Sequence, residues 1–340
     1  MTEGDNTIHV IINADITDTI VEQLRAVSPR LHIERYYPNV PESAWANAEV
    51  LFISGRNLPD PTQAPRLRWI QTFSAGLDHI LDLPIVQAED VEITSTSGMH
   101  ATQMAEFSLM MMLAFEYKLP KMLELQHKAE WPESRYDIFS PLALRGQTLG
   151  IVGYGSIGRE LARIADALGM VVVASKRNVK QTADEESYTE AGTGDPAGDI
   201  PTRLYPSEAV ASMVSVCDYV VITVPRTKDT YHLFNEEVLN AMKKTAVLIN
   251  VGRGGVIDED ALVSALASGK IAGAALDVFE QEPLPADSPL WGLDNLIIAP
   301  HISGFTTRYD EKAAALFAEN LERYLNNQPL FNRLDRGRGY

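Results

Sequence analysis

The sequence has few cysteines, no long apolar run and no basic leader. Cys217 is the one cysteine in 340 residues, which excludes an internal disulfide and a four-cysteine zinc site. No apolar run approaches the roughly 18 to 20 residues that span a membrane. The acidic, polar start MTEGDNTIHV is unlike a signal peptide. We therefore expect a cytoplasmic protein that does not enter a membrane, with Cys217 packed inertly in its interior.

Basic residues are also scarce. The chain has 29 lysines and arginines against 46 aspartates and glutamates, a formal net charge of −17, and its first lysine is Lys118. Nucleic-acid binding needs a basic face, so this balance argues against a nucleic-acid partner. Two interpretations of the acidity stay open: an ordinary acidic protein, or a halophilic one whose carboxylate surface suits a salty cytoplasm.

Apolar sequence is plentiful, but it comes in short runs. Hydrophobic residues make up 45% of the chain, enough for sizeable cores, and 340 residues suggest about two domains. Runs typical of strands alternate with helical patterns, which predicts an α/β fold with parallel sheets covered by helices. We expect strands within 7–12, 31–37, 50–53, 67–73, 91–94, 149–152, 170–174, 217–224, 246–251, 271–276 and 296–299, and helices within 17–27, 101–117 and 313–326.

The order of these elements predicts two domains. Residues 1–99 form the first, and the apolar face of helix 313–326 returns to it, so that it also takes in residues 306–340. Residues 100–305 form the second, and their polar stretch 116–145 is interpreted as a dimerisation excursion. Gln181–Pro201 is acidic, rich in Gly, Ser and Thr and poor in apolar residues, which indicates an exposed loop or insertion.

A glycine-rich turn lies between two apolar runs of the second domain. The stretch TLGIVGYGSIG contains Gly153, Gly155 and Gly158, a helical pattern follows, and MVVVASKRN begins at Met170. In this context the first glycine allows the turn, the second lets backbone approach a pyrophosphate, and the third lets helix and strand pack closely. The helix N-terminus would present N–H groups to the phosphates. The stretch therefore predicts a dinucleotide site.

Three successive strand runs end next to a side chain with useful chemistry: Arg253, Asp277 and His301. Carboxyl ends of parallel strands border the ligand crevice, so we expect all three at one site. Arg253 matches a substrate carboxylate, His301 suits acid/base work, and Glu282 can accept from its imidazole. Asp277 could accept from a nicotinamide carboxamide. The set suits hydride transfer to a 2-keto acid, although each residue taken singly could be structural.

Five segments resemble the D-isomer-specific 2-hydroxyacid dehydrogenase family. LRGQTLGIVGYGSIGRELA resembles its cofactor signature, MKKTAVLINVGRGGVIDEDAL its arginine signature, GAALDVFEQEPLP its Asp and Glu signature, SPLWGLDNLIIAPHISG its histidine signature and LRWIQTFSAGLDHI its substrate loop. The resemblance implies two Rossmann-like or flavodoxin-like domains, a cleft between them that closes on substrate, and a homodimer. It implies Arg253 as the substrate-binding cation, His301 as the acid/base and Glu282 as its partner.

The resemblance also implies binding residues outside this set. Backbone N–H groups around Ser74, Ala75 and Gly76 would hold the substrate carboxylate. The segment GMHATQMAEF stands where the family more commonly has an asparagine- and valine-containing version, and its Met104 is expected near the nicotinamide. The cofactor-binding residues expected in total are Met104, Gly153, Gly155, Ser156, Ile157, Gly158, Ser175, Lys176, Arg177, Val224, Pro225, Thr230, Val251, Gly252 and Asp277, and no metal ligand is expected.

The second strand of the cofactor motif ends differently from the NAD-specific pattern. An acidic residue there accepts from the ribose 2′-hydroxyl of NAD, but this chain has Lys176 between Ser175 and Arg177. Two cations and a hydroxyl suit a 2′-phosphate, so we predict a preference for NADP(H), with NAD(H) as a possible second cofactor. The alternative is that Lys176 and Arg177 only point into solvent.

The leading hypothesis is an NADP(H)-linked D-2-hydroxyacid dehydrogenase that reversibly reduces 2-keto acids. A glyoxylate/hydroxypyruvate reductase would differ from it only in pocket shape. A different class is a non-catalytic, NAD(P)-sensing binding protein, because some relatives in the family act as corepressors. The intact Arg253, Glu282 and His301 argue against that class. The partners expected are a small 2-keto or 2-hydroxy acid and a second copy of the chain.

Overall fold

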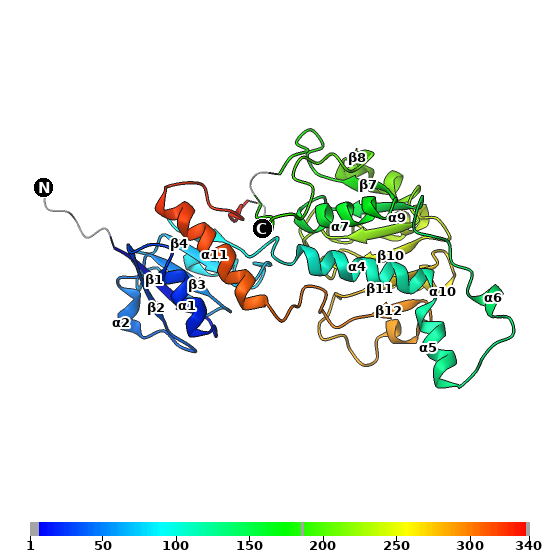
Figure 1. Ribbon diagram of the computed structural model, residues 1–340, viewed down its shortest axis with the longest axis horizontal. Coiled ribbons are helices and arrows are strands. Elements are labelled where there is room, and N and C mark those ends of the chain that lie inside the picture. The colour runs from blue at the N-terminus through cyan, green and yellow to red at the C-terminus, as the bar shows by residue number, and fades with distance from the viewer. Residues whose placement is uncertain (1–6, 185–186, 338–340) are drawn as a thin grey trace, which may run out of the picture. The chain divides into compact units, whose positions relative to one another are not determined.

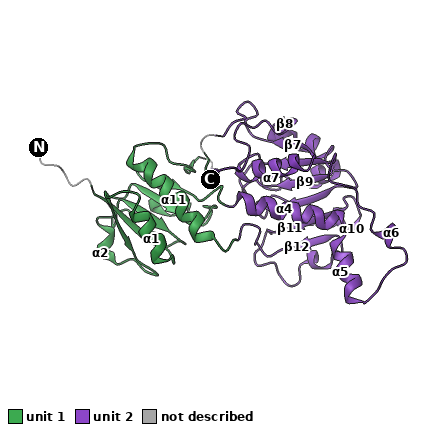
Figure 2. Cartoon of the chain, in the orientation of Figure 1, with its two compact units in different colours: residues 1–99, 186–188, 306–340 green, residues 100–185, 189–305 purple. Residues whose placement is uncertain are grey.

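A computed structural model describes residues 7–184 and 187–337. The chain forms two compact units (Figure 2). Of the described residues, the first unit holds 7–99, 187–188 and 306–337, and the second holds 100–184 and 189–305. Each unit is built on one parallel sheet (Figure 1). The predicted α/β class, with two parallel-sheet domains, is confirmed.

The first unit has a five-stranded sheet in the order β2-β1-β3-β4-β5, with all neighbours parallel. Thr17 caps the first helix by accepting from the N–H of Ile20. The last helix packs on this unit through Phe317 and Leu321, as expected. The elements are β1 (Ile8–Asn13), α1 (Asp18–Arg25), β2 (Leu31–Arg35), α2 (Glu42–Trp45), β3 (Val50–Ile53), β4 (Trp69–Thr72), α3 (Pro84–Gln87), β5 (Glu92–Thr94) and α11 (Tyr309–Leu325).

The second unit has a seven-stranded sheet in the order β12-β11-β10-β9-β6-β7-β8, again with all neighbours parallel. Its strands are β6 (Thr148–Val152), β7 (Val171–Ser175), β8 (Arg203–Tyr205), β9 (Tyr219–Ile222), β10 (Val247–Asn250), β11 (Gly273–Leu276) and β12 (Leu296–Ile298). Its helices are α4 (Ala101–Glu116), α5 (Leu119–His127), α6 (Arg135–Ile138), α7 (Ser156–Ala167), α8 (Val210–Val214), α9 (Glu236–Ala241) and α10 (Glu259–Ala267), with short 3₁₀ turns at Ser207–Ala209 and Pro289–Gly292.

Helices cover both faces of this larger sheet. Val221 and Ile249 join the apolar cluster that contains α4 and α7. Val220 and Leu248, their neighbours in sequence, join the cluster that contains α8, α9 and α10. Successive strand residues point to opposite faces, so apolar runs without alternation mark strands buried on both sides. The edges where the strands end are then the places left for a ligand.

Cys217 lies in this core, fully buried, and burial raises the pKa of its thiol to about 12. The expected inert position is confirmed. Within residues 7–184 and 187–337, no helix is both long and apolar enough to cross a lipid bilayer.

Candidate cofactor and active site

Many of the functional residues expected in the second unit lie along one edge of its sheet. They follow the carboxyl ends of six strands, which are consecutive neighbours in the sheet. In sheet order these positions are His301 after β12, Asp277 after β11, Arg253 after β10, Val224 and Pro225 after β9, Gly153 after β6 and Lys176 after β7. The edge therefore has the acid/base candidate on one side of the glycine turn and Lys176 on the other.

The glycine turn has the shape that a dinucleotide needs. Gly153 has a φ of +104°, and a Cβ added to it would lie 2.7 Å from Cγ1 of Val224. A Cβ at Gly158 would lie 2.4 Å from the carbonyl oxygen of Gly153, so helix α7 can pack on the turn only with glycine there. Among the described residues, no heavy atom lies within 4 Å of a Cβ built at Gly155, which begins α7 without a side-chain cap. This open N-terminus, continued by Ser156 and Ile157, fits a pyrophosphate.

The loops after β9 and β10 pack closely on the glycine turn. A Cβ at Gly252, next to Val251, would lie 2.6 Å from the carbonyl oxygen of Val224. The Thr230 hydroxyl donates to the carbonyl of Pro225 at 2.6 Å, and thereby shapes the loop after β9. Met104, 9% exposed, packs in the apolar cluster of α4 and α7. Its expected contact with the nicotinamide stays a prediction.

His301 is paired with Glu282. Nδ1 of the imidazole lies 2.7 Å from Oε2 of Glu282, and the other carboxylate oxygen accepts from the N–H of Phe279 at 3.0 Å. The backbone N–H of Phe279 thus fixes the Glu282 carboxylate on the side away from His301. The His301 side chain is about half exposed, with a relative accessibility of 51%. Because Nδ1 faces the carboxylate, Nε2 is the nitrogen left for a reacting oxygen.

Asp277 supports the His301 loop. It is 1% exposed, and its two carboxylate oxygens accept from the backbone N–H groups of Ile302 at 2.7 Å and Ser303 at 3.0 Å. His301 itself has a φ of +55°, a left-handed conformation that a non-glycine residue adopts at a cost. The sequence suggested Asp277 only as an acceptor for the carboxamide. In the structure the carboxylate binds the loop that carries His301, and the expected contact with the carboxamide stays a prediction.

Asn250 organises the Arg253 loop and was not among the expected residues. Its side-chain N–H donates to the carbonyl of Arg253, and its side-chain oxygen accepts from the N–H of Gly252, both at 3.0 Å. A Cβ at Gly254 would lie 1.7 Å from the carbonyl oxygen of Phe279, so this loop must pass close to the one leading to Glu282. The available signal was a polar residue ending the apolar run AVLIN, directly before the arginine loop.

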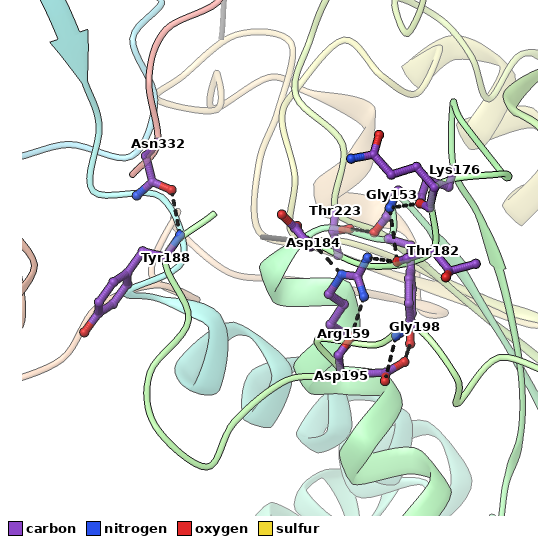
Figure 3. A network of polar contacts seen from close by, with 12 residues as sticks. Gly153, Arg159, Lys176, Thr182, Asp184, Tyr188, Asp195, Gly198, Thr223 and Asn332 are labelled. Atoms are coloured by element: carbon purple, nitrogen blue, oxygen red, sulfur yellow. Dashed lines mark hydrogen bonds and ion pairs between the residues drawn. The ribbon is translucent and has the colours of Figure 1, made fainter. Parts of the chain in front are cut away.

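The end of β7 meets the inserted segment (Figure 3). The Lys176 ammonium donates to the carbonyls of Gln181 at 2.6 Å and Thr182 at 3.4 Å, so it does not simply point into solvent, whereas Arg177 is exposed. Ser175 is 3% exposed, and its carbonyl accepts from the N–H groups of Gly153 and Tyr154. Ser175 therefore belongs to the glycine turn.

Residues 181–184 and 187–201 are irregular, as predicted, but they are not simply exposed. Asp195 and Gly198 are buried among them, and Figure 3 shows Asp195 beside Arg159 of helix α7. The expectation of an exposed loop is wrong for these residues, because buried polar groups of α7 give the segment partners that its composition does not reveal.

The expected substrate-binding residues of the first unit follow β4. The Thr72 hydroxyl donates to the carbonyl of Ser74 at 2.8 Å, and the Ser74 hydroxyl donates to the carbonyl of Gly76 at 2.9 Å. Ser74, Ala75 and Gly76 are half-buried. Within the part of the chain that the structure describes, no group of three or more His, Cys, Asp or Glu residues could hold a metal ion.

Known proteins are similar to this chain in sequence and in fold. The profile of the family described as D-isomer specific 2-hydroxyacid dehydrogenase, NAD binding domain, matches residues 109–303. A glyoxylate reductase of Thermofilum pendens is 38% identical over 260 residues, which cover 76% of this chain and 72% of that protein.

Two solved structures match almost the whole chain. One is a D-isomer specific 2-hydroxyacid dehydrogenase family protein from Aeromonas salmonicida, with a TM-score of 0.77, 31% identity and coverage of 97% of this chain and 99% of the other. The second is a D-isomer specific 2-hydroxyacid dehydrogenase from Xanthobacter autotrophicus in complex with NADPH and MES, with a TM-score of 0.79, 26% identity and coverage of 98% and 100%. The chain belongs to the D-isomer specific 2-hydroxyacid dehydrogenase family and is an NAD(P)-dependent oxidoreductase of 2-hydroxy acids.

Proposed function

We propose that this enzyme reduces small 2-keto acids to D-2-hydroxy acids with NADPH, and that glyoxylate and hydroxypyruvate are the first substrates to test. The observation that carries the proposal is the pairing of His301 with Glu282, 2.7 Å apart, on the sheet edge that also bears Arg253 and the glycine turn. The Thermofilum pendens relative supports the choice of glyoxylate.

The proposed roles follow from charge and geometry. A reduced nicotinamide bound at this sheet edge would supply the hydride that the carbonyl carbon accepts. His301 delivers a proton from Nε2 to the carbonyl oxygen, which leaves a 2-hydroxy acid and a neutral imidazole. Glu282 orients the ring through the hydrogen bond to Nδ1. The proton and the two electrons of the reduction are thereby accounted for.

Binding of the substrate carboxylate is assigned to Arg253 and to backbone N–H groups. A guanidinium can form two parallel hydrogen bonds to a carboxylate, and Asn250 fixes the loop from which Arg253 extends. Ser74, Ala75 and Gly76 are proposed to contribute N–H groups from a turn shaped by side-chain hydrogen bonds. We assign residues 100–305 to dinucleotide binding and residues 1–99 with 306–340 to substrate binding.

The proposed cofactor preference is for NADP(H), with NAD(H) as a possible second cofactor. No carboxylate follows β7; Lys176 and Arg177 stand there instead, and a 2′-phosphate needs cations at this position. The Xanthobacter autotrophicus relative was crystallised with NADPH, which supports the assignment.

We also propose a homodimer built on residues 116–145. This stretch exposes large apolar side chains: Trp131 is 85%, Tyr136 73% and Leu142 72% exposed. Exposed aromatic groups of this size are typical of protein contacts. Light scattering in solution should give twice the mass of the chain, and a monomer at micromolar concentration would contradict the dimer.

The net charge of −17 further suggests that activity and assembly rise with salt.

A panel of 2-keto acids, assayed with NADPH and NADH at low and high salt, tests the function. We expect NADPH oxidation with glyoxylate or hydroxypyruvate and a D-configured product wherever the product is chiral. His301→Ala should lower kcat by about 10²- to 10⁴-fold, whereas Arg253→Ala should also raise KM. NADPH binding without turnover of any 2-keto acid would instead support the non-catalytic, cofactor-sensing alternative.

A further inference from the structure

The segment between β7 and β8 is held on helix α7 by buried polar side chains (Figure 3). Tyr154 and Arg159, both 2% exposed, come from the glycine turn and from α7. The Tyr154 hydroxyl donates to Oδ2 of Asp195 at 2.5 Å, and the Arg159 guanidinium donates to the carbonyl of Asp195. Glu160, fully buried, accepts from the N–H of Gly194 at 2.7 Å. Gly194 and Asp195 of this segment are therefore firmly attached to the second unit.

Asp195 is the centre of this attachment. Its Oδ1 accepts from the N–H groups of Gly198 at 3.0 Å and Asp199 at 3.2 Å, and its Oδ2 accepts from Ile200 at 3.1 Å as well as from Tyr154. Burial opposes the charge of Asp195, but the hydrogen bonds from Tyr154 and the backbone outweigh it and lower the pKa of the carboxyl. The Asp195 carboxylate thus fixes residues 198–200, the part of the segment that leads to β8.

Gly198, in this part of the segment, packs against the carbonyl of Thr182. Gly198 has a φ of +77°, and a Cβ added to it would lie 2.5 Å from the Thr182 carbonyl oxygen. The same oxygen accepts from Arg159 and from the ammonium of Lys176. Asp195 therefore influences the position of the Lys176 side chain through two contacts. Gly198 packs on the Thr182 carbonyl, and this carbonyl accepts from Lys176.

Two cations converge on this one neutral carbonyl. Burial, and then the charge of Arg159, lower the pKa of Lys176, and the charge of Asp184 partly opposes them. An ammonium has three N–H donors. The carbonyls of Gln181 and Thr182 accept from Lys176 and leave one donor direction for a further oxygen. A phosphate dianion placed there would meet an ammonium already held in position.

We propose that the described residues 181–184 and 187–200 form a specificity element, anchored by Asp195, which orders Lys176 to bind the 2′-phosphate of the cofactor. This inference rests on the proposed NADP(H) preference. A lysine side chain is flexible, and ordering it before binding removes an entropic penalty that corresponds to about a 10- to 30-fold change in affinity. Asp195 then acts on cofactor choice without touching the cofactor.

Calorimetric titration of the full-length protein with NADP⁺ and NAD⁺ tests the proposal without any turnover. Asp195→Asn puts an amide N–H₂ where one carboxylate oxygen accepts two donors, whichever way the side chain is turned. We expect NADP⁺ affinity to fall about 10-fold and NAD⁺ affinity to stay within about twofold. Adenosine 2′,5′-bisphosphate should follow NADP⁺, and adenosine 5′-monophosphate should follow NAD⁺.

Two further variants isolate the mechanism. Gly198→Ala keeps Asp195 but pushes a methyl group onto the Thr182 carbonyl, and should have the same selective effect. Asp218→Asn is the matched control: Asp218 also accepts from a backbone N–H, that of Thr148, but next to the amino ends of β6 and β9. It should leave the ratio of the two affinities unchanged. In a Lys176→Ala background, Asp195→Asn should have no further effect on that ratio, because coupled changes are not additive.

The outcomes separate this inference from the cofactor proposal. A wild-type protein that binds NADP⁺ no more tightly than NAD⁺ would refute the cofactor preference and this inference together. A wild-type preference for NADP⁺ that survives Gly198→Ala and Asp195→Asn would refute only the inference. Equal weakening of both cofactors, or an undiminished effect in the Lys176→Ala background, would also refute it, because the segment would then not act through Lys176.

Discussion

Replacing Asp277 with asparagine should misplace the acid/base histidine. The substitution hardly changes size, but it turns one carboxylate oxygen into a donor. In the wild type the two oxygens accept from the N–H groups of Ile302 and Ser303 at 2.7 and 3.0 Å. Asparagine can accept one of these bonds and must point its own N–H₂ at the other. Asp277 is 1% exposed, so water cannot readily take over the lost bond.

The expected magnitude follows from these contacts. A hydrogen bond to a charged acceptor contributes about 1.5 to 3 kcal/mol, and a buried N–H left without an acceptor costs about 1 to 3 kcal/mol. His301 has a φ of +55° in this loop, a conformation that also costs about 1 kcal/mol or more and that the Asp277 clamp helps to maintain. A loss of about 3 kcal/mol lowers the population of the reactive arrangement about 100-fold, since 1.4 kcal/mol is a factor of ten.

Steady-state kinetics with NADPH and the best keto acid measures the effect. We expect kcat to fall about 100-fold in Asp277→Asn, with the KM for NADPH changing far less. In a His301→Ala background the same substitution should change kcat little, because both act on one group. Asp218→Asn serves as the control for a carboxylate that accepts from backbone elsewhere in the same sheet. A kcat within about twofold of wild type, with only the cofactor KM raised, would refute the reasoning and favour a carboxamide contact instead.

Two other predictions concern ionisation. Burial, with the charges of Glu280 and Asp260, raises the pKa of Glu259 above its ordinary 4.5, so the fold is favoured while this carboxyl is protonated and loses that contribution as pH rises through the raised pKa. Glu259→Gln should therefore raise Tm at pH 7 and lose this advantage below pH 4.5; an equal change of Tm at both pH values would contradict it. Burial raises the pKa of Cys217 to about 12, so the native thiol should resist alkylation at pH 8 and react only after unfolding, and stoichiometric labelling of the folded protein would show that the site opens.

Much of the fold follows from local sequence patterns. Short apolar runs alternating with helical periodicity are enough to predict parallel sheets, since a strand covered on both faces has no polar side. The glycine turn was identifiable because each glycine has a steric role, and the contacts around Gly153 and Gly158 agree with those roles. Strand β8 was not predicted, because its sequence RLY begins with a charged residue and contains a single aliphatic one, and helix α8 was not predicted, because five residues are too short for a helical period.

The candidate site likewise has features that the sequence predicted and features that it did not. The positions of Arg253, Asp277 and His301 at one sheet edge followed from the sequence, because parallel strands bring their carboxyl ends together. The pairing of His301 with Glu282 was expected from chemistry, and the structure brings the two within hydrogen-bond distance. The role of Asn250 was not predicted, because an asparagine at the end of a strand has several common uses.

By itself, the sequence determined which segments form buried strands, where the backbone must turn on glycine, and which reactive side chains stand at strand ends. Only the tertiary structure decided what those side chains contact. Asp277 accepts from Ile302, 25 residues away, and Tyr154 donates to Asp195, 41 residues away. Periodicity reports which face of an element is buried, whereas a hydrogen bond depends on distances of a few tenths of an ångström between groups that only the folded chain brings together.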